Sequence, residues 1–327
     1  MESARCKAFL VSAETGSFSK AAEALGYTPS GVSQLVTAFE GDLGFALLTR
    51  NKRGVAPTAD GERMLPAVRD FLAHERRIYQ IAADIKGLSV GEVTIATYPS
   101  ISTHWLPGVI RGFRAQYPRI KIKLMEGIRQ EIIQWLEEKR ADVAFLSYKE
   151  PMPYDWVPLA EDEMLAVLPK AHPLAAAAAY PLRRCHEESF IMPAMGRDAD
   201  VAALFERNGL ELNVQFTTLQ NFAAISMVEQ GLGISIMNEL ITRNWQCDVV
   251  KLPLDPPQKI ILGMALLSRE NASPAVKRFV KYAAERLNRL GGAMAKCAGR
   301  GCGRGFRFEK PPPASSPRPD KCFVKRG

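Results

Sequence analysis

The N-terminal part of the chain alternates between short runs with hydrophobic residues at helical spacing and brief polar interruptions. Three helices are predicted from this pattern, over residues 4–13, 18–25 and 29–40. Ser17 and Thr28 stand where N-caps belong, Gly26 fits a helix stop, and Pro29 suits a first helical position. Two helices joined by a tight turn and packed on a third are typical of a helix-turn-helix.

The third predicted helix has a polar and a hydrophobic side. The hydrophobic side consists of Val32, Leu35, Val36 and Phe39, and the polar side of Ser30, Ser33, Gln34 and Thr37. A glutamine can pair with adenine through two hydrogen bonds, and serine hydroxyls can serve several bases. We therefore expect the polar side to contact base edges. Periodicity alone leaves a second interpretation open, a plain three-helix domain with a solvated polar face.

A small wing and a long helix are predicted to follow. Residues 44–58 are interpreted as two short strands with basic residues at the tip, namely Arg50, Lys52 and Arg53, which suit contacts to DNA phosphates. A helix over residues 59–86 carries a seam at spacings of four and three: Met64, Val68, Phe71, Glu75, Ile78, Ala82 and Ile85. Such a seam favours pairing with the same helix of a second copy.

Beyond the boundary at residues 87–91 the pattern changes to alternating strands and helices. Strands are predicted at 93–97, 120–125, 141–146, 164–168, 190–192, 214–217, 234–237 and 259–267, and helices at 102–116, 130–139, 201–208, 222–230 and 274–290. This alternation predicts an α/β domain with a mainly parallel sheet. The tail, residues 291–327, is rich in Gly, Pro, Ser and Arg and is expected to be disordered.

Composition and charge narrow the class of protein without deciding it. The chain is 47% hydrophobic, yet it has no apolar run of the roughly 18 residues that a membrane span needs. The N-terminus lacks a signal-peptide core, so a cytoplasmic location without membrane association is expected. The net charge is +8, but the tail alone contributes nine Lys or Arg against two acidic residues. Bulk charge therefore does not make the case for DNA binding.

No constellation for catalysis or for a metal is found. The four histidines are isolated, and the sequence has no HExxH, GxSxG or P-loop motif. Cys297 and Cys302 lack both zinc-ligand spacing and nearby histidines. We predict no catalytic residue, no metal and no cofactor. Two other classes stay open: a solute-binding protein built on the α/β half, and a structural DNA-binding protein anchored by the basic tail.

One resemblance covers the N-terminal region as a continuous string. The stretches GSFSKAAEALG, SGVSQLVTAFE, LGFALLTR and PTADGE follow one another in register. They resemble the DNA-binding end of the LysR-type transcriptional regulators. Departures are Pro29 in place of a common glutamine and Gly31 in place of a usual alanine. These departures bear on the operator sequence and not on the class.

The resemblance implies an architecture for the whole chain. It implies a winged helix-turn-helix over residues 1–58, a dimerising linker helix over 59–88, and an effector domain of the type II periplasmic-binding-protein kind over 91–290. Lobe I would comprise about 91–160 and 265–290, and lobe II about 161–264. The expected partners are double-stranded promoter DNA, a small-molecule effector, further copies of the chain in a homodimer or homotetramer, and RNA polymerase if the protein activates.

Effector contacts are expected where strands of the α/β domain end, because ligands lie outside the carboxyl ends of strands in open sheets. The candidates are hydroxyl side chains at such ends: Ser100, Ser102, Thr103, Ser147, Thr217 and Thr218. Each of them could instead be an ordinary helix cap. Arg129 could bind a carboxylate, although a solvated surface arginine is the favoured interpretation. The effector is expected to be anionic or polar.

Overall fold

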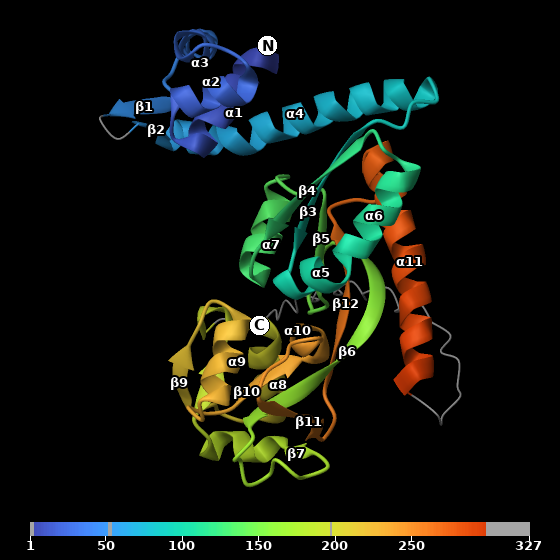
Figure 1. Ribbon diagram of the computed structural model, residues 1–327. Coiled ribbons are helices and arrows are strands. Elements are labelled where there is room, and N and C mark those ends of the chain that lie inside the picture. The colour runs from blue at the N-terminus through green and yellow to red at the C-terminus, as the bar shows by residue number, and fades with distance from the viewer. Residues whose placement is uncertain (1–2, 52–53, 197, 299–327) are drawn as a thin grey trace, which may run out of the picture.

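The computed structural model describes residues 3–51, 54–196 and 198–298 (Figure 1). The N-terminal domain consists of α1 (Ser3–Thr15), α2 (Phe18–Leu25), α3 (Pro29–Leu43), β1 (Leu48–Asn51) and β2 (Gly54–Pro57), followed by the long helix α4 (Ala59–Ile85). The predicted winged helix-turn-helix and linker helix are thereby confirmed. Figure 1 shows this domain at one end of α4, and the effector domain extends away from the other half of that helix.

The predicted helix starts and stops of this domain form as hydrogen-bonded caps. Ser17 accepts a bond from the amide of Lys20, and Thr28 accepts one from the amide of Gly31 at 3.1 Å. Gly26 ends α2 with a φ of 71°, a conformation that glycine adopts without a steric penalty. Local chemistry at the turn therefore sets the angle at which α3 leaves α2.

The wing is fixed by close contact with α3 and α4. Glu40 in α3 accepts hydrogen bonds from the amides of Leu47 at 2.8 Å and Leu48 at 3.0 Å. Thr58 caps α4 through the amide of Gly61 at 2.9 Å. A Cβ added at Gly61 would lie 2.1 Å from the carbonyl oxygen of Leu47. Only glycine leaves enough space for this approach of α4 to the wing.

The effector domain is built from the remaining elements. Its strands are β3 (Gly91–Thr97), β4 (Ile120–Glu126), β5 (Val143–Ser147), β6 (Asp155–Pro169), β7 (Tyr180–Pro181), β8 (Phe190–Met192), β9 (Val214–Thr217), β10 (Ser235–Asn238), β11 (Val249–Asp255) and β12 (Lys259–Leu266). Its α-helices are α5 (Pro99–His104), α6 (Leu106–Gln116), α7 (Arg129–Glu137), α8 (Ala199–Asn208), α9 (Asn221–Glu229), α10 (Glu239–Thr242) and α11 (Pro274–Ala298).

The main sheet is mixed, which corrects the prediction of a mainly parallel one. Its strand order is β4-β3-β5-β12-β6-β11-β7, and β10 pairs with β6 as well. Strand β3 is parallel to β4 and β5, whereas β12, β10 and β11 are all antiparallel to β6. The physical reason is that β6 carries the chain from lobe I to lobe II and β12 carries it back. Because the two strands run between the lobes in opposite directions and pair with each other, they are antiparallel.

Three further predictions need correction. The single helix predicted over 102–116 is two helices, because Pro107 in the first turn of α6 has no N–H to continue the hydrogen bonding of α5. Strand β11 was not expected from the sequence. Helix α11 continues past Leu290 to Ala298, so the expected disorder does not begin at 291. The rest of the predicted tail lies outside the described residues.

Ion pairs join α4 to both neighbouring domains. Arg69 of α4 lies 3.4 Å from Glu14 in α1 and 3.5 Å from Glu138, the residue that follows α7. Lys139 pairs with Asp70 of α4 at 2.6 Å. One helix thus contacts the DNA-binding domain and lobe I through adjacent residues. Among the helices of the described ranges, none is long and apolar enough to cross a membrane.

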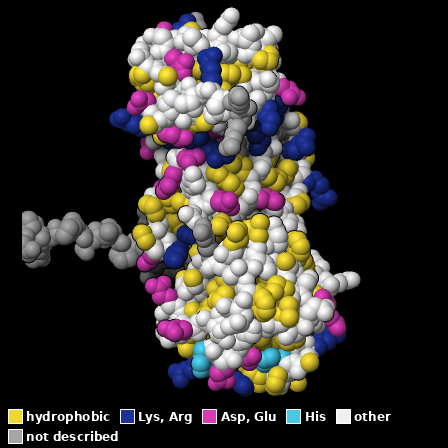
Figure 2. Space-filling model, turned by 90° about the vertical axis from the view of Figure 1, so that its left-hand side faces the viewer, with side chains coloured by type: hydrophobic (Ala, Val, Ile, Leu, Met, Phe, Trp, Pro, Cys, Tyr) yellow, Lys and Arg dark blue, Asp and Glu magenta, His cyan; other side chains and the backbone are white. Residues whose placement is uncertain are grey.

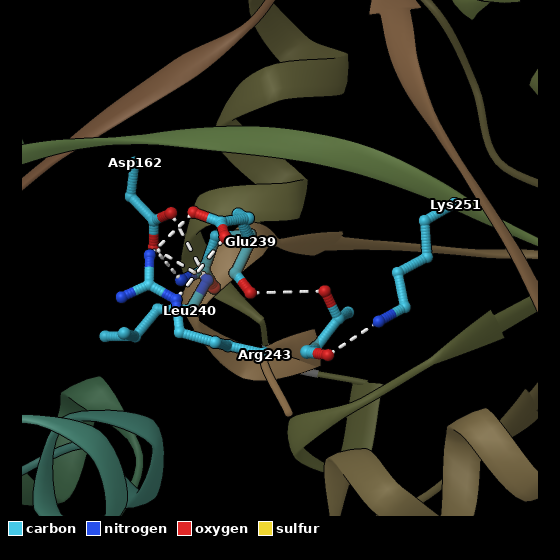
Figure 3. Close-up of polar contacts among 7 residues, drawn as sticks. Asp162, Glu239, Leu240, Arg243 and Lys251 are labelled. Carbon is cyan, nitrogen blue, oxygen red and sulfur yellow. Dashed lines mark hydrogen bonds and ion pairs between the residues drawn. The ribbon is translucent and has the colours of Figure 1, made fainter. Parts of the chain in front are cut away.

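A buried carboxylate attaches α10 to β6 in lobe II (Figure 3). Asp162 is 5% exposed and accepts hydrogen bonds from the side-chain amide of Asn238 and from the backbone amide of Leu240 at 3.2 Å. Figure 3 shows Glu239 and Arg243 paired beside it, with 2.7 Å between their nearest atoms. This arrangement fixes the end of β10 relative to the strand that joins the two lobes.

We expect Gly61→Ala to destabilise the DNA-binding domain by roughly 1–3 kcal/mol, because the added methyl group collides with backbone and not with a movable side chain. The measurement is native-state hydrogen exchange of amides in α1–α3. Gly41→Ala is the matched control: a Cβ there meets nothing within 4 Å, and alanine favours the interior of α3 by about 1 kcal/mol. If Gly61→Ala stabilised the DNA-binding domain as much as Gly41→Ala does, this account of the contact between α4 and the wing would be contradicted.

A pH dependence is expected from Asp162, since burial raises the pKa of its carboxyl to about 6 from an ordinary 3.8. The folded state holds the proton more tightly, so the free energy of unfolding falls as the pH rises from about 4 to about 6. Asp162→Asn keeps an acceptor and removes the charge. Between about pH 4 and 6 the unfolding free energy of the unmodified protein should therefore fall by roughly 2–3 kcal/mol more than that of Asp162→Asn.

Denaturation at several pH values, followed by tryptophan fluorescence, measures this difference, because all four tryptophans lie in the effector domain. Glu163→Gln removes an exposed carboxylate from the same strand and should leave the pH profile unchanged. Parallel profiles for Asp162→Asn and the unmodified protein would show that the buried carboxyl is not the titrating group.

Candidate nucleic-acid interface and effector cleft

Helix α3 presents its predicted polar side to the surface. Ser30, Gln34 and Thr37 are exposed and Ser33 is half-buried. On the opposite side Val32, Val36 and Phe39 are buried in the core of the domain, and Leu35 packs against that core. Amphipathic burial of this kind orients α3 so that its short polar side chains face away from the protein.

Arg50 lies against α3 and α2. Its Nη2 donates to Thr37 Oγ1 at 2.9 Å, and its guanidinium carbon is 5.2 Å from the centre of the Phe18 ring. These contacts place a permanent positive charge beside the polar side of α3, close to one residue predicted to contact bases. No sequence spacing signals the pairing of Arg50 with Phe18. Lys52 and Arg53, the other predicted wing residues, lie outside the described residues.

A cleft of about 360 Å³ opens between the two lobes of the effector domain. Lobe I contributes the start of α5 and the connection from β4 into α7. Lobe II contributes the starts of α8 and α9 together with the end of β10. The lining residues are Tyr98, Pro99, Ser100, Glu126, Gly127, Ile128, Arg129, Glu131, Ala194, Asp198, Ala199, Asp200, Leu219, Gln220, Asn221, Asn238 and Ile241.

Of the six predicted effector residues, Ser100 lines this cleft. Ser102 and Thr103 lie on the same short helix, and the Thr103 hydroxyl donates to the carbonyl of Pro99 at 2.8 Å. The single hydroxyl proton of Ser102 is within reach of the same carbonyl at 2.9 Å and of Glu126 Oε1 at 2.5 Å. Thr217 and Thr218 are outside the lining, and the Thr218 hydroxyl donates to the carbonyl of Gln220. These hydroxyls donate to backbone carbonyls, whereas an N-cap side chain accepts from an amide, so they do not act as the helix caps that were the alternative interpretation.

Ser147 is fully buried and belongs to a polar group next to the cleft. Its hydroxyl lies 3.1 Å from the Tyr98 hydroxyl and 3.2 Å from Arg129 Nη1, and its carbonyl accepts from the same Nη1 at 2.6 Å. The interpretation of Arg129 as a solvated surface residue is therefore wrong. Its guanidinium is held in the cleft by the end of β5, a tertiary contact that local sequence could not reveal.

Two acidic residues of lobe II were missed by the sequence analysis. Asp198 caps α8, accepting from the amides of Asp200 and Val201 at 3.0 and 3.1 Å, and an Asp before a hydrophobic run was an available signal. Burial, then the neighbouring Asp200 charge, raises the pKa of Asp198 to about 6. Burial also raises the pKa of Asp200, against the opposing effects of Ser147 and Arg129.

The surface outside the cleft gives no single-sign face on the side shown in Figure 2. Basic and acidic side chains are interspersed there, in agreement with the small net charge of the chain without its tail. Within the described ranges no group of three or more His, Cys, Asp or Glu side chains could hold a metal ion. The side chain of Cys297 and all of Cys302 lie outside what the structure describes.

Comparisons with known proteins agree with this architecture. Residues 4–62 match the bacterial regulatory helix-turn-helix proteins of the lysR family, and residues 86–288 match the LysR substrate binding domain. The chain is 34% identical over 283 residues to the HTH-type transcriptional regulator YvbU of Bacillus subtilis, covering 85% of this chain and 96% of that protein.

Two solved structures share the fold. Full-length CbnR complexed with its target DNA matches with a TM-score of 0.61 and 22% identity, over 88% of this chain and 100% of that one. The effector binding domain of QuiR in complex with shikimate matches with a TM-score of 0.55 and 22% identity, over 61% of this chain and 98% of that one. With both domain families matched in order along the sequence, the chain belongs to the LysR family of bacterial transcriptional regulators.

Proposed function

We propose that this regulator reads promoter DNA through the exposed side of α3 and that a small molecule in the cleft between the lobes controls that binding. The observation that carries the proposal is the polar side of α3, Ser30, Ser33, Gln34 and Thr37, with Arg50 bonded beside it. Base edges need short polar side chains and phosphates need cations, and this surface offers both. Lys52 and Arg53 are proposed to add phosphate contacts from the wing.

The working unit is proposed to contain at least two copies of the chain, paired through α4. Hydrophobic side chains in the second half of this helix are exposed, with Ile78 at 66% and Ile85 at 82%. The first half of the predicted seam, Met64, Val68 and Phe71, packs on the core of the DNA-binding domain. Burial of the exposed second half against the same helix of a partner would stabilise a dimer. Paired α3 helices could then enter major grooves about 34 Å apart. If the protein activates transcription, RNA polymerase is a further partner.

Each segment of the chain is proposed to have one function. Residues 1–58 bind DNA, 59–88 pair the subunits, and 91–290 bind the effector. The cleft is proposed as the effector site because its lining combines charged, amide and apolar side chains within a volume suited to a metabolite. The QuiR domain, which has the same fold, is described with shikimate bound. Ser100 is the predicted hydroxyl residue that lines the cleft and is proposed as an effector contact, whereas Ser102, Thr103, Ser147, Thr217 and Thr218 lie outside the lining.

Selection of genomic fragments on the purified protein tests this function. We expect a partly palindromic site near a promoter to be enriched, with the same site for a chain that ends at Ala298. Loss of all binding on removal of residues 299–327 would instead favour a basic-tail anchor, whose binding depends steeply on salt and little on sequence. Absence of any enriched site would contradict a sequence-specific regulator.

Gln34→Ala is expected to weaken binding to the selected site by on the order of 1–3 kcal/mol, because the side chain is placed to pair with one base. Binding to random DNA should stay within error. The measurement is fluorescence anisotropy with both DNAs at one salt concentration. Gln116→Ala makes the same chemical change on the exposed surface of α6 and should alter neither affinity. Equal losses on both DNAs would remove Gln34 from the base-reading residues.

A further inference from the structure

The cleft has an excess of negative charge. Its described lining includes the carboxylates of Glu126, Glu131, Asp198 and Asp200 and one cationic side chain, Arg129. Water and ions screen charges at the surface, but they screen less in a partly enclosed cleft. An anionic ligand would meet net repulsion there.

Arg129 already has partners within the protein. It donates to the carbonyl and the hydroxyl of Ser147 and interacts electrostatically with Asp200 from the opposite lobe. Hydrogen-bonding capacity of the guanidinium is thus already used within the protein. An anionic effector that approached Arg129 would also approach the four carboxylates of the lining.

Three of the carboxylates use one oxygen each in hydrogen bonds that fix the lining. Glu126 Oε1 accepts from Ser102 at 2.5 Å, Glu131 Oε2 accepts from the amide of Ile128 at 2.9 Å, and Asp198 Oδ1 caps α8. These bonds hold the carboxylates in place and leave the second oxygen of each without a hydrogen bond in the described structure. Burial raises the pKa of both Asp198 and Asp200, so bringing a cation to these carboxyls would favour their charged form.

We propose that the effector is a small molecule with a protonated amine, whose ammonium group is bound by the cleft carboxylates Glu126, Asp198 and Asp200. The amides of Gln220, Asn221 and Asn238 supply donors and acceptors for its other polar groups, and Ile128, Leu219 and Ile241 cover its carbon skeleton. This inference rests on the proposed placement of the effector in the cleft. Of the anionic or polar effector expected from the sequence, it keeps the polar character and excludes a purely anionic molecule.

Two size-matched series of probes test the charge preference with the full chain. The four-carbon series is 1,4-diaminobutane, 4-aminobutanoate, 1,4-butanediol and succinate, and the six-carbon series is 1,6-diaminohexane, 6-aminohexanoate, 1,6-hexanediol and adipate. Isothermal titration calorimetry at pH 7.5 gives each Kd. We expect a diamine or amino acid to bind at least about tenfold more tightly than the dianion of the same length. Tighter binding of succinate or adipate, or no binding by any amine, would overturn the proposal.

Substitutions locate the effect. Glu126→Gln and Asp200→Asn should each weaken amine binding several-fold, whereas Glu211→Gln, an exposed site in lobe II outside the lining, should not. Ser100→Trp, which fills the cleft, should abolish binding of every probe. If a dianion binds more tightly than the amines and Ser100→Trp abolishes that binding, the cleft is still the effector site, but the proposal of an amine effector is refuted. Amine binding that is unchanged in all the cleft variants would refute the placement of the effector itself.

Discussion

Pairing between β6 and β12 is the constraint on which the effector domain depends. These two strands are hydrogen-bonded from Lys259–Glu163 to Leu266–Asp155, across the boundary between the lobes. Toward lobe I, β12 continues the sheet to β5, and toward lobe II, β6 carries β10 and β11. The lobes are therefore parts of one sheet. The cleft lies between the helices at their facing ends, where α5 and α7 approach α8, α9 and α10.

Much of the fold was predictable because its signals are local. Caps such as Ser17 and Thr28, the stop at Gly26 and the amphipathic pattern of α3 lie within a few residues of the structure they determine. Strands β8 and β9 were also predicted with their observed bounds. Strand direction was not predictable in this way, because alternation of strands and helices says nothing about which strands carry the chain between lobes.

The cleft was harder to predict than the DNA-binding surface. A recognition helix is one element, so its polar side can be deduced from spacing alone, whereas the cleft joins side chains from elements far apart in the sequence. Sequence spacing therefore predicts hydroxyls at strand ends as contacts, but several of these hydroxyls bond to nearby backbone carbonyls. Arg129 and Asp200 could not be recognised in this way, because they line one cleft only when the two lobes come together.

Helix α7 connects two regions with unrelated chemistry. Its first residue, Arg129, lies in the cleft, and the residues just after its end, Glu138 and Lys139, pair with Arg69 and Asp70 of α4. Insertion of one residue would turn one end relative to the other by about 100° and lengthen the helix by about 1.5 Å. The contacts at both ends could not then be kept. The length of α7 is consequently fixed from both directions, and we expect relatives with this arrangement to vary in its exposed side chains but not in its number of residues.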